Sequence, residues 1–404
     1  MKIIVVGGGA AGFFTAINLA EKIPSAAITM LEQSQKLLSK VKVSGGGRCN
    51  VTNGRTLPQE LQPFYPRGGK KLYPVFKQFS TREMRSWLSS KGVETKEEDD
   101  QRVFPVSNSS QTIIDCFLKL TSQYSIQIKT GEVLTHLKQK NEGWEIQTRT
   151  ATYVSDCVII ATGSSPKTWH LLSEIGLKLV SPVPSLFTFN ISDSRISQLS
   201  GVSVEETVVR VVGSKMIETG PLLITHWGLS GPAILKLSSI GALELHQMNY
   251  QFEVLINWVG GLQESDIRTH WDAYTKAHPK RLIMKYPLWN LPRRLWESIV
   301  TYCEIPDTLS FSDISKKATN KLIEELIQGR YQVNGKSTFK DEFVTAGGVD
   351  LSEIDLNDFS CKKYPGLYFA GEVLNIDALT GGFNFQACWS AGWLISEAIS
   401  KSNT

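Results

Sequence analysis

The first 32 residues constrain the fold of this chain more than any other stretch. Residues 3–6 (IIVV) form a continuous apolar run, which is typical of a strand buried on both faces. Glycines follow at positions 7, 9 and 12, and a second apolar strand, residues 28–31, ends at Glu32. The order strand, turn, helix, strand predicts a Rossmann-type α/β sheet that binds a dinucleotide.

Each glycine of this stretch, and the acid that ends it, has a physical purpose in such a fold. Gly7 permits the tight turn, Gly9 lets the backbone approach a diphosphate, and Gly12 lets the helix lie close to the strand. The carboxylate of Glu32 is placed to accept hydrogen bonds from ribose hydroxyls, and it would repel a 2′-phosphate. We therefore expect FAD or NAD rather than NADP. Glycines with this spacing also occur in plain turns, but here the strand, helix and acid all fall where the ligand needs them.

The length, charge and cysteine content of the chain limit its possible domains, partners and redox centres. The chain has 404 residues, enough for two or three domains, and a net charge of +4 from 43 basic and 39 acidic residues. This charge is mild and dispersed along the chain, so we expect no nucleic-acid partner. The six cysteines form no C-x-x-C pair, which argues against a zinc or dithiol centre and favours a reducing cytoplasm. Short apolar runs, and a first strand that begins directly after Met1, predict neither a membrane span nor a signal peptide.

A second glycine-rich stretch, residues 44–53, reads SGGGRCNVTN. Its three glycines would present bare N–H groups to an anionic or planar ligand, with Arg48 available to a phosphate and Asn50 to a polar ring edge. A flexible surface loop is the alternative, and the density of specific donors favours the ligand loop. Cys49 is either a small buried thiol, the commoner case, or a redox group.

Two further turns fit the same ligand. Residues 157–160 (CVII) form a buried strand that turns sharply at the sequence ATG, positions 161–163. Residues 366–372 (GLYFAGE) form another strand, followed by TGGFNFQ at 380–386 and a helix expected over 387–399. The N–H groups of a helix that begins beside Gly381 and Gly382 would stabilise negative charge at the N1/O2 edge of a flavin. The alternative is an ordinary helix cap.

The character of the chain changes near Pro182. Alternating segments at 187–191, 202–212 and 251–258 predict strands, and residues 263–277, 292–303 and 312–328 are helical in pattern. We therefore expect a discontinuous α/β domain, residues 1–186 and 342–404. The inserted domain, residues 187–341, would hold a β-barrel and a helical part at about 262–329.

The chain resembles the BaiN-like (YhiN-like) family of FAD-binding oxidoreductases, which includes aminoacetone oxidase-like members. The resemblance covers almost the whole chain. The motifs that carry it are VGGGAAG (6–12), SGGGRCNVTN (44–53), RVFPVSN (102–108), THWGLSGPAILKLS (225–238), TAGGV (345–349) and GLYFAGEVLNIDALTGGFNFQACWSAGWL (366–394). It implies a Rossmann-type FAD domain interrupted by an insert with a β-barrel and a helical part.

The resemblance also implies positions for the cofactor. Gly7, Gly9, Ala11 and Gly12 would hold the diphosphate, and Glu32 the ribose. Along the dinucleotide would lie Lys40, Ser44, Gly45, Gly46, Arg48 and Asn50, with Val133 at the adenine and Ala161, Thr162 and Gly163 nearby. Beside the ribityl chain and isoalloxazine would lie Gly371, Glu372, Gly382, Phe383 and Asn384. Members often have a further glycine after the ATG turn; here the sequence is SSPKTW, which alters the packing beside that turn and the shape of the substrate pocket.

These features predict an FAD-dependent oxidoreductase that acts on a small organic substrate by hydride transfer at flavin N5. A second G-x-G-x-x-G is lacking, so either NAD(P)H docks transiently, as in a reductase, or O₂ accepts the electrons, as in an oxidase. His226 and Arg102 are the candidate catalytic residues. His226 has the alternative of a packed structural histidine, and Arg102 that of pairing with the preceding acidic run. A flavin-dependent RNA-modifying enzyme and a non-catalytic FAD-binding protein remain as other classes, and the oligomeric state stays open.

Overall fold

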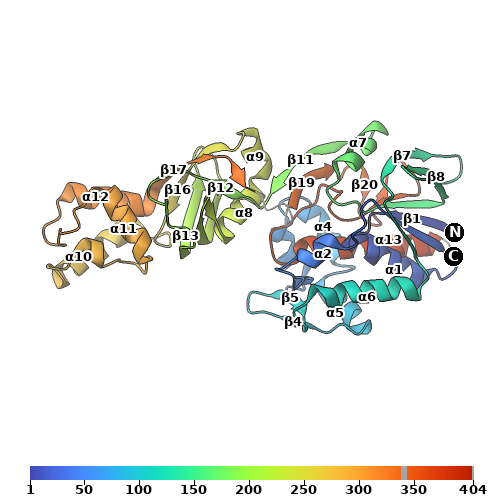
Figure 1. The fold of residues 1–404 in the computed structure, drawn as a ribbon, viewed down its shortest axis with the longest axis horizontal. Helices are drawn as coiled ribbons and strands as arrows, with labels where there is room; N and C mark the ends of the chain where they lie inside the picture. The colour runs from blue at the N-terminus through green and yellow to red at the C-terminus, as the bar shows by residue number, and fades with distance from the viewer. Residues whose placement is uncertain (338–343, 403–404) are drawn as a thin grey trace. The chain divides into compact units, whose positions relative to one another are not determined.

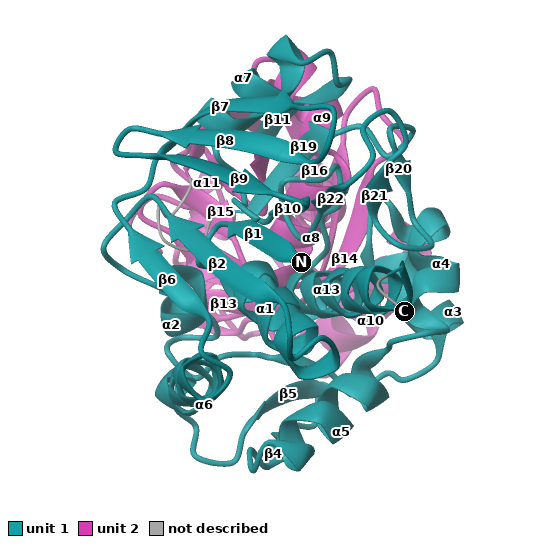
Figure 2. Cartoon of the chain, turned by 90° about the vertical axis from the view of Figure 1, so that its right-hand side faces the viewer, with its two compact units in different colours: residues 1–183, 340–404 teal, residues 184–339 magenta. Residues whose placement is uncertain are grey.

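The computed structural model describes residues 1–337 and 344–402. The chain divides into two compact units, residues 1–183 with 340–404 and residues 184–339, which Figure 2 shows in two colours. The first boundary falls at 183/184, three residues before the one we expected. The second expected boundary, at 341/342, lies outside the described residues.

A seven-stranded sheet forms the centre of unit 1. Its strand order is β20-β21-β22-β10-β1-β2-β6, so strands from both ends of the chain belong to one sheet and β10 lies between them. The bounds are β1 Lys2–Val6, β2 Ala27–Glu32, β6 Gln127–Thr130, β10 Cys157–Ile160, β20 Ile354–Asp355, β21 Ser360–Cys361 and β22 Leu367–Phe369. β1 pairs in parallel with β10 and with β2, and residues 3–6 are buried as their apolar run predicts.

Helices α1 (Ala10–Lys22) and α13 (Phe383–Ser402) pack against each other beside this sheet, as seen in Figure 1. Their approach depends on Gly392, where a Cβ atom would lie 2.6 Å from the hydroxyl oxygen of Thr15. The ring of Phe14 fills the space around the two helices and contacts Trp389 at a centroid distance of 5.3 Å. The last helix thereby completes the core that the first helix begins.

Residues 69–90 form two helices in place of one continuous helix: α4 (Gly69–Phe76) and α5 (Thr81–Ser90). The break arises because Ser80 and Glu83 form a capping box that starts a new helix. The remaining elements of unit 1 form smaller sheets and short helices. They are α2 Ser39–Val43, β3 Thr52–Asn53, α3 Pro58–Leu61, η1 Gln62–Phe64, β4 Thr95–Glu97, β5 Arg102–Pro105, α6 Ser110–Gln123, β7 Leu134–Gln139, β8 Trp144–Thr148, β9 Thr152–Ser155, α7 Pro166–Glu174, β11 Leu179–Ser185 and β19 Val344–Val349.

Unit 2 contains a second seven-stranded sheet, in the order β17-β16-β13-β14-β15-β12-β18. Its two outermost strands are consecutive in the chain and separated only by Gly335, so the sheet curls until its edges meet, as the predicted barrel requires. The bounds are β12 Thr188–Asn190, β13 Ser203–Val211, β14 Ile217–Thr225, β15 Gly228–Ser230, β16 Gln251–Asn257, β17 Gly329–Asn334 and β18 Lys336–Ser337, with helices α8 Pro232–Ile240 and α9 Ala242–Gln247.

The helical part of unit 2 consists of α10 (Glu264–Ala277), η2 (Ile283–Lys285), α11 (Arg293–Tyr302) and α12 (Lys316–Gln328). Its core is built from large buried side chains such as Trp271 and Trp296. Arg195 joins this part to the barrel, because its guanidinium pairs with Asp193 and Glu325 and lies 3.8 Å from the centroid of the Tyr331 ring. All three helices expected from the sequence are present.

Candidate functional site

The glycine turn after β1 has the geometry expected of a dinucleotide-binding site. Gly7 has a φ of +118°, and its N–H donates to the carbonyl of Leu31 at 2.8 Å. A Cβ at Gly12 would lie 2.0 Å from the Gly7 carbonyl oxygen, so only glycine lets α1 start this close to β1. At Gly9, by contrast, a Cβ would meet no atom within 4 Å. The backbone at Gly9 is therefore open to a ligand. Ala11 follows it, buried in the first turn of α1.

Glu32, at the end of β2, is held by backbone donors. One carboxylate oxygen accepts from the N–H of Gly8 at 2.7 Å and the other from the N–H of Ser34 at 2.8 Å. These bonds fix the carboxylate beside the glycine turn with hydrogen-bonding capacity to spare, because each of its oxygens has two lone pairs. The predicted role of Glu32 at a ribose hydroxyl stays a prediction.

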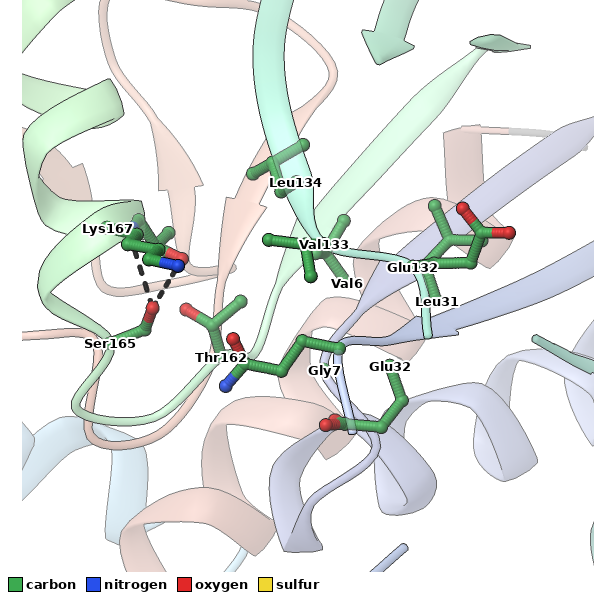
Figure 3. A pocket seen from close by; sticks show the side chains of 12 residues that line it. Val6, Gly7, Leu31, Glu32, Glu132, Val133, Leu134, Thr162, Ser165 and Lys167 are labelled. Atoms are coloured by element: carbon green, nitrogen blue, oxygen red, sulfur yellow. Dashed lines mark hydrogen bonds between the residues drawn. The ribbon is translucent and has the colours of Figure 1, made fainter. Parts of the chain in front are cut away.

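A pocket opens at this edge of the sheet, and Figure 3 shows the residues around it. Gly7, Glu32, Val133 and Thr162 contribute to its lining from four separate segments. The hydroxyl of Thr162 is buried and has no hydrogen-bond partner among the described residues. An orphaned buried hydroxyl, an open glycine and a fixed carboxylate together fit the adenosine half of FAD.

The remaining predicted residues of the ATG turn are Ala161 and Gly163. Ala161 is buried, and its N–H donates to the carbonyl of Val6 at 2.8 Å, which continues the β1–β10 pairing. Gly163 has a φ of +59° and points toward Glu372, whose carboxylate would lie 3.8 Å from a Cβ at this position. The turn therefore connects the pocket with the C-terminal part of the site.

Lys40 and Glu372, predicted separately along the dinucleotide, are paired with each other in the structure. Lys40 also donates to the Ser164 hydroxyl at 3.3 Å, and the second carboxylate oxygen of Glu372 accepts from the N–H of Thr345 at 3.0 Å. The pair therefore joins α2, the turn after β10 and the turn after β22.

The SGGGRCN loop leaves α2 at Ser44, whose hydroxyl donates to the carbonyl of Val41. Gly45 and Gly46 have φ values of +58° and +68°, and a Cβ at Gly46 would meet no atom within 4 Å. The backbone at Gly46 is open, like that at Gly9. The two loops therefore offer bare peptide groups on which a diphosphate or a flat ring can lie.

The side chains that follow these glycines are already engaged. Arg48 pairs with Glu98 at 2.6 Å, and its guanidinium lies 3.9 Å from the centroid of the Phe104 ring. The buried amide of Asn50 accepts from the N–H of Gly382 at 2.9 Å and donates to the Thr52 carbonyl at 2.9 Å. Asn50 therefore ties this loop to the start of α13, while Arg48 is turned to a carboxylate.

Cys49 is fully buried, and burial raises the pKa of its thiol to about 12. At neutral pH it carries its proton, so it lacks the thiolate that redox and nucleophilic chemistry require. Its backbone φ of +61° belongs to the tight turn of the loop. The structure thus favours the buried-thiol interpretation of Cys49 over a redox role.

The start of α13 faces the same side of the sheet. It begins at Phe383, one turn before the expected Ala387. Gly382 has a φ of +86°, and a Cβ there would lie 2.3 Å from the Thr52 carbonyl oxygen, so glycine is required. Asn384 donates to and accepts from the backbone of Ala378 at 2.9 and 3.0 Å.

Gly371, at the end of β22, lies against α1 and α13. A Cβ at this position would be 3.1 Å from that of Ala11 and 3.0 Å from the sulfur of Cys388. The sites predicted for the diphosphate and for the ribityl chain are therefore direct neighbours in the structure. Phe383 is buried, with its ring stacked 4.3 Å from Phe64.

Sequence reasoning missed a buried ion pair beside these residues. Asp377 is fully buried, and both of its carboxylate oxygens accept from the guanidinium of Arg67. The hydroxyl of the nearby buried Tyr65 donates to the carbonyl of Phe383 at 2.6 Å. The available signal was an aspartate among the mainly apolar residues 373–379, but its partner lies 310 positions away in the sequence.

The two candidate catalytic residues lie in different units. Arg102, in unit 1, pairs with Glu98 at 3.3 Å and with Asp100 at 2.6 Å, so it is held by the acidic run that precedes it. His226, in unit 2, is exposed at the turn between β14 and β15. Because His226 is exposed, and the neighbouring Trp227 is 64% exposed, the alternative of a packed structural histidine was wrong.

Within the described residues no cluster of three His, Cys, Asp or Glu side chains is arranged to hold a metal ion. A search of the same residues finds no helix with the length and apolar character of a membrane span.

The fold and the pocket define a Rossmann-type FAD-dependent oxidoreductase. The chain belongs to the family described as HI0933-like protein Rossmann domain, whose model matches residues 1–398. It is 27% identical to the ribosomal RNA dihydrouridine synthase of Escherichia coli, over 98% of this chain and 97% of the relative. It is 24% identical to the 3-dehydro-bile acid delta(4,6)-reductase of Clostridium scindens, over 99% of both chains. The second relative confirms the expected BaiN-like family.

Solved structures agree in fold. A 3-ketosteroid-delta4-(5alpha)-dehydrogenase from Rhodococcus jostii aligns with a TM-score of 0.50 and 13% identity, over 98% of this chain and 97% of that one. A quinol fumarate reductase subunit from E. coli also gives a TM-score of 0.50, at 12% identity, over 99% of this chain and 70% of that one. At such identities the likeness concerns the fold alone.

Proposed function

We propose that the chain reduces a carbon–carbon double bond conjugated to a carbonyl group, with NAD(P)H as the electron donor. The observation that carries the proposal is shared chemistry between two relatives with unrelated substrates. Dihydrouridine is uridine with two hydrogens added across a double bond next to a carbonyl, and the other relative is named for reducing a 3-dehydro-bile acid. Both relatives match nearly the full chain.

The overall change balances with one nicotinamide. The substrate gains a hydride and a proton and becomes saturated, while NAD(P)H loses the hydride and becomes NAD(P)⁺. Bound FAD would supply the relay, by accepting the hydride at N5 and donating it to the electron-poor carbon of the substrate. The protein's part is to hold the cofactor and to stabilise developing negative charge.

Several groups of unit 1 suit that part. Gly9, Gly46 and the Thr162 hydroxyl offer open or unpaired contacts to the dinucleotide. The N-terminus of α13 presents its positive dipole end beside Gly382, where negative charge at a flavin ring would be stabilised. Arg67 and Asp377 act as positioning residues, since Asp377 adjoins Ala378, which Asn384 binds at the start of α13.

We assign no step to the two earlier catalytic candidates. The guanidinium of Arg102 is held by two carboxylates, and an arginine does not release its proton near neutral pH. His226 is exposed at the turn between β14 and β15, and no hydrogen bond to the described residues orients its side chain. The proton that accompanies the hydride therefore comes from solvent in this proposal.

The test follows flavin absorbance in the purified holoprotein without oxygen. We expect NADH or NADPH to bleach the flavin, and an added cyclic enone or uridine-containing RNA to restore the colour faster than air does. Loss of bleaching with both nicotinamides would overturn the proposal. Rapid reoxidation by O₂ with peroxide release, and none by the alkenes, would instead identify an oxidase such as the aminoacetone type.

A further inference from the structure

A cationic stretch stands out in the helical part of unit 2. Residues 273–296 contain six lysines and arginines and no aspartate or glutamate, so their charge exceeds the +4 of the whole chain. The six are Lys276, Lys280, Arg281, Lys285, Arg293 and Arg294. The chain-wide balance of charges, on which the expectation of no nucleic-acid partner rested, conceals this concentration. The stretch runs from the end of α10 to the start of α11.

Aromatic side chains hold the centre of this stretch in place. Arg281 donates to the hydroxyl of Tyr274 at 2.8 Å, and its guanidinium lies 4.7 Å from the centroid of the Tyr286 ring. The ring of Tyr274 lies 4.7 Å from that of His278. The backbone of Arg281 is fixed as well, because its carbonyl accepts from the N–H of Phe311 at 3.0 Å. These side-chain and backbone contacts therefore hold the segment in a defined conformation.

We name this the 274–286 surface; it consists of Tyr274, His278, Lys280, Arg281, Lys285 and Tyr286. Within the described chain, no carboxylate forms an ion pair with Lys280, Arg281 or Lys285. Other cations of the helical part are neutralised: Arg268 pairs with Glu264 at 2.6 Å, for example. Clustered cations without counter-charges repel one another and favour an anionic partner.

The surface also offers an aromatic platform. Tyr286 is 40% exposed although a guanidinium lies over its ring, and Lys280 and Lys285 are exposed as well. Close by in the chain, the indole N–H of Trp289 is buried without a hydrogen-bond partner among the described residues. Exposed aromatic rings between cations are what single-stranded nucleic acids require, since phosphates contact the cations and unstacked bases lie on the rings.

A membrane fits the same features less well. Tyr286 is the one large hydrophobic side chain of residues 273–296 that is exposed, whereas interfacial helices bury a broad apolar face. We propose that the 274–286 surface binds single-stranded RNA, with Lys280, Arg281 and Lys285 at phosphates and Tyr286 beneath a base. The choice of RNA among polyanions rests on the proposed function. Uracil is the RNA base that has a carbon–carbon double bond next to a carbonyl group, which is the bond that the proposed reaction reduces.

The experiment measures binding of the holoprotein to a fluorescently labelled single-stranded RNA by anisotropy, at several salt concentrations. The Lys280→Ala/Lys285→Ala double variant should weaken binding and reduce the slope of log K against log salt by about 1.4, from about 0.7 for each lost phosphate contact. Tyr286→Ala should weaken binding by at least about fivefold. The matched control is Lys316→Ala/Lys317→Ala, which removes two exposed lysines from the same helical part.

Two results would contradict RNA binding by the 274–286 surface. One is an equal loss of RNA affinity in the double variant and in its control, and the other is tighter binding to phosphatidylserine vesicles than to RNA. Dihydrouridine formation is assayed separately, by mass spectrometry of the RNA. If the protein binds RNA specifically but NAD(P)H reduces neither its flavin nor the RNA, the RNA-binding surface is supported and the proposed function is wrong. If the protein reduces a small enone but does not bind RNA, the proposed function is supported and the proposed RNA-binding surface is wrong.

Discussion

At the scale of single residues, Glu32 decides how the adenosine half of the cofactor is held. Its carboxylate is fixed by the N–H groups of Gly8 and Ser34 and lines the pocket. Hydrogen bonds to a charged acceptor contribute about 1.5–3 kcal/mol each. We expect Glu32→Ala to raise the Kd for FAD by about tenfold to a hundredfold, as measured by quenching of flavin fluorescence on titration of the apoprotein.

Gln33→Ala is the matched control, since Gln33 lines the same pocket but is exposed. It should leave the Kd almost unchanged. If both variants bind FAD as tightly as the original chain, the ribose does not lie at Glu32, and the proposed orientation of the dinucleotide is wrong.

At the scale of elements, the site depends on how closely α13 starts to β3. A Cβ at Gly382 would lie 2.3 Å from the Thr52 carbonyl oxygen, which is backbone and cannot move aside cheaply. Gly382→Ala should therefore displace the start of α13, so that the purified protein retains little FAD. The ratio of flavin to protein absorbance measures this loss.

Gly92→Ala separates the two physical effects of that substitution. Gly92 has a φ of +81°, close to the +86° of Gly382, but a Cβ there meets no atom within 4 Å. It should cost about 1–2 kcal/mol of stability from the left-handed backbone and leave the flavin in place. Equal flavin loss in both variants would mean that backbone strain, rather than the contact of α13 with β3, controls the site.

At the scale of the whole molecule, the sequence predicted the elements whose pattern is local. The apolar runs of β1, β2 and β10 and the glycines after β1 predicted the central sheet and one half of the site. β14 was missed because Gly220 and Pro221 interrupt its alternating pattern. In the structure these two residues remain within the strand, opposite a β-bulge in β13. The Arg67–Asp377 pair was also missed, because no local pattern connects residues 310 positions apart.

The two compact units have separate hydrophobic cores, and this separation makes a prediction for cofactor removal. One core contains Phe14 and Trp389, and the other contains Trp258 and Trp296. All of the residues that we propose for FAD belong to unit 1. A ligand stabilises the unit that binds it, by about 2.7 kcal/mol at a free concentration one hundred times its Kd. We therefore expect FAD binding to add no stabilisation free energy to unit 2 directly.

Hydrogen exchange followed by mass spectrometry reports on both units in one sample. Amide groups in core elements exchange through larger openings, whose free energy rises when a ligand binds the closed form. Adding FAD to the apoprotein should therefore slow exchange in peptides from β1, α1 and α13. Exchange in peptides from β13, β16 and α11 should stay the same. Equal protection in both sets would instead mean that the two cores unfold as one cooperative unit, with the cofactor stabilising the insert through the FAD domain.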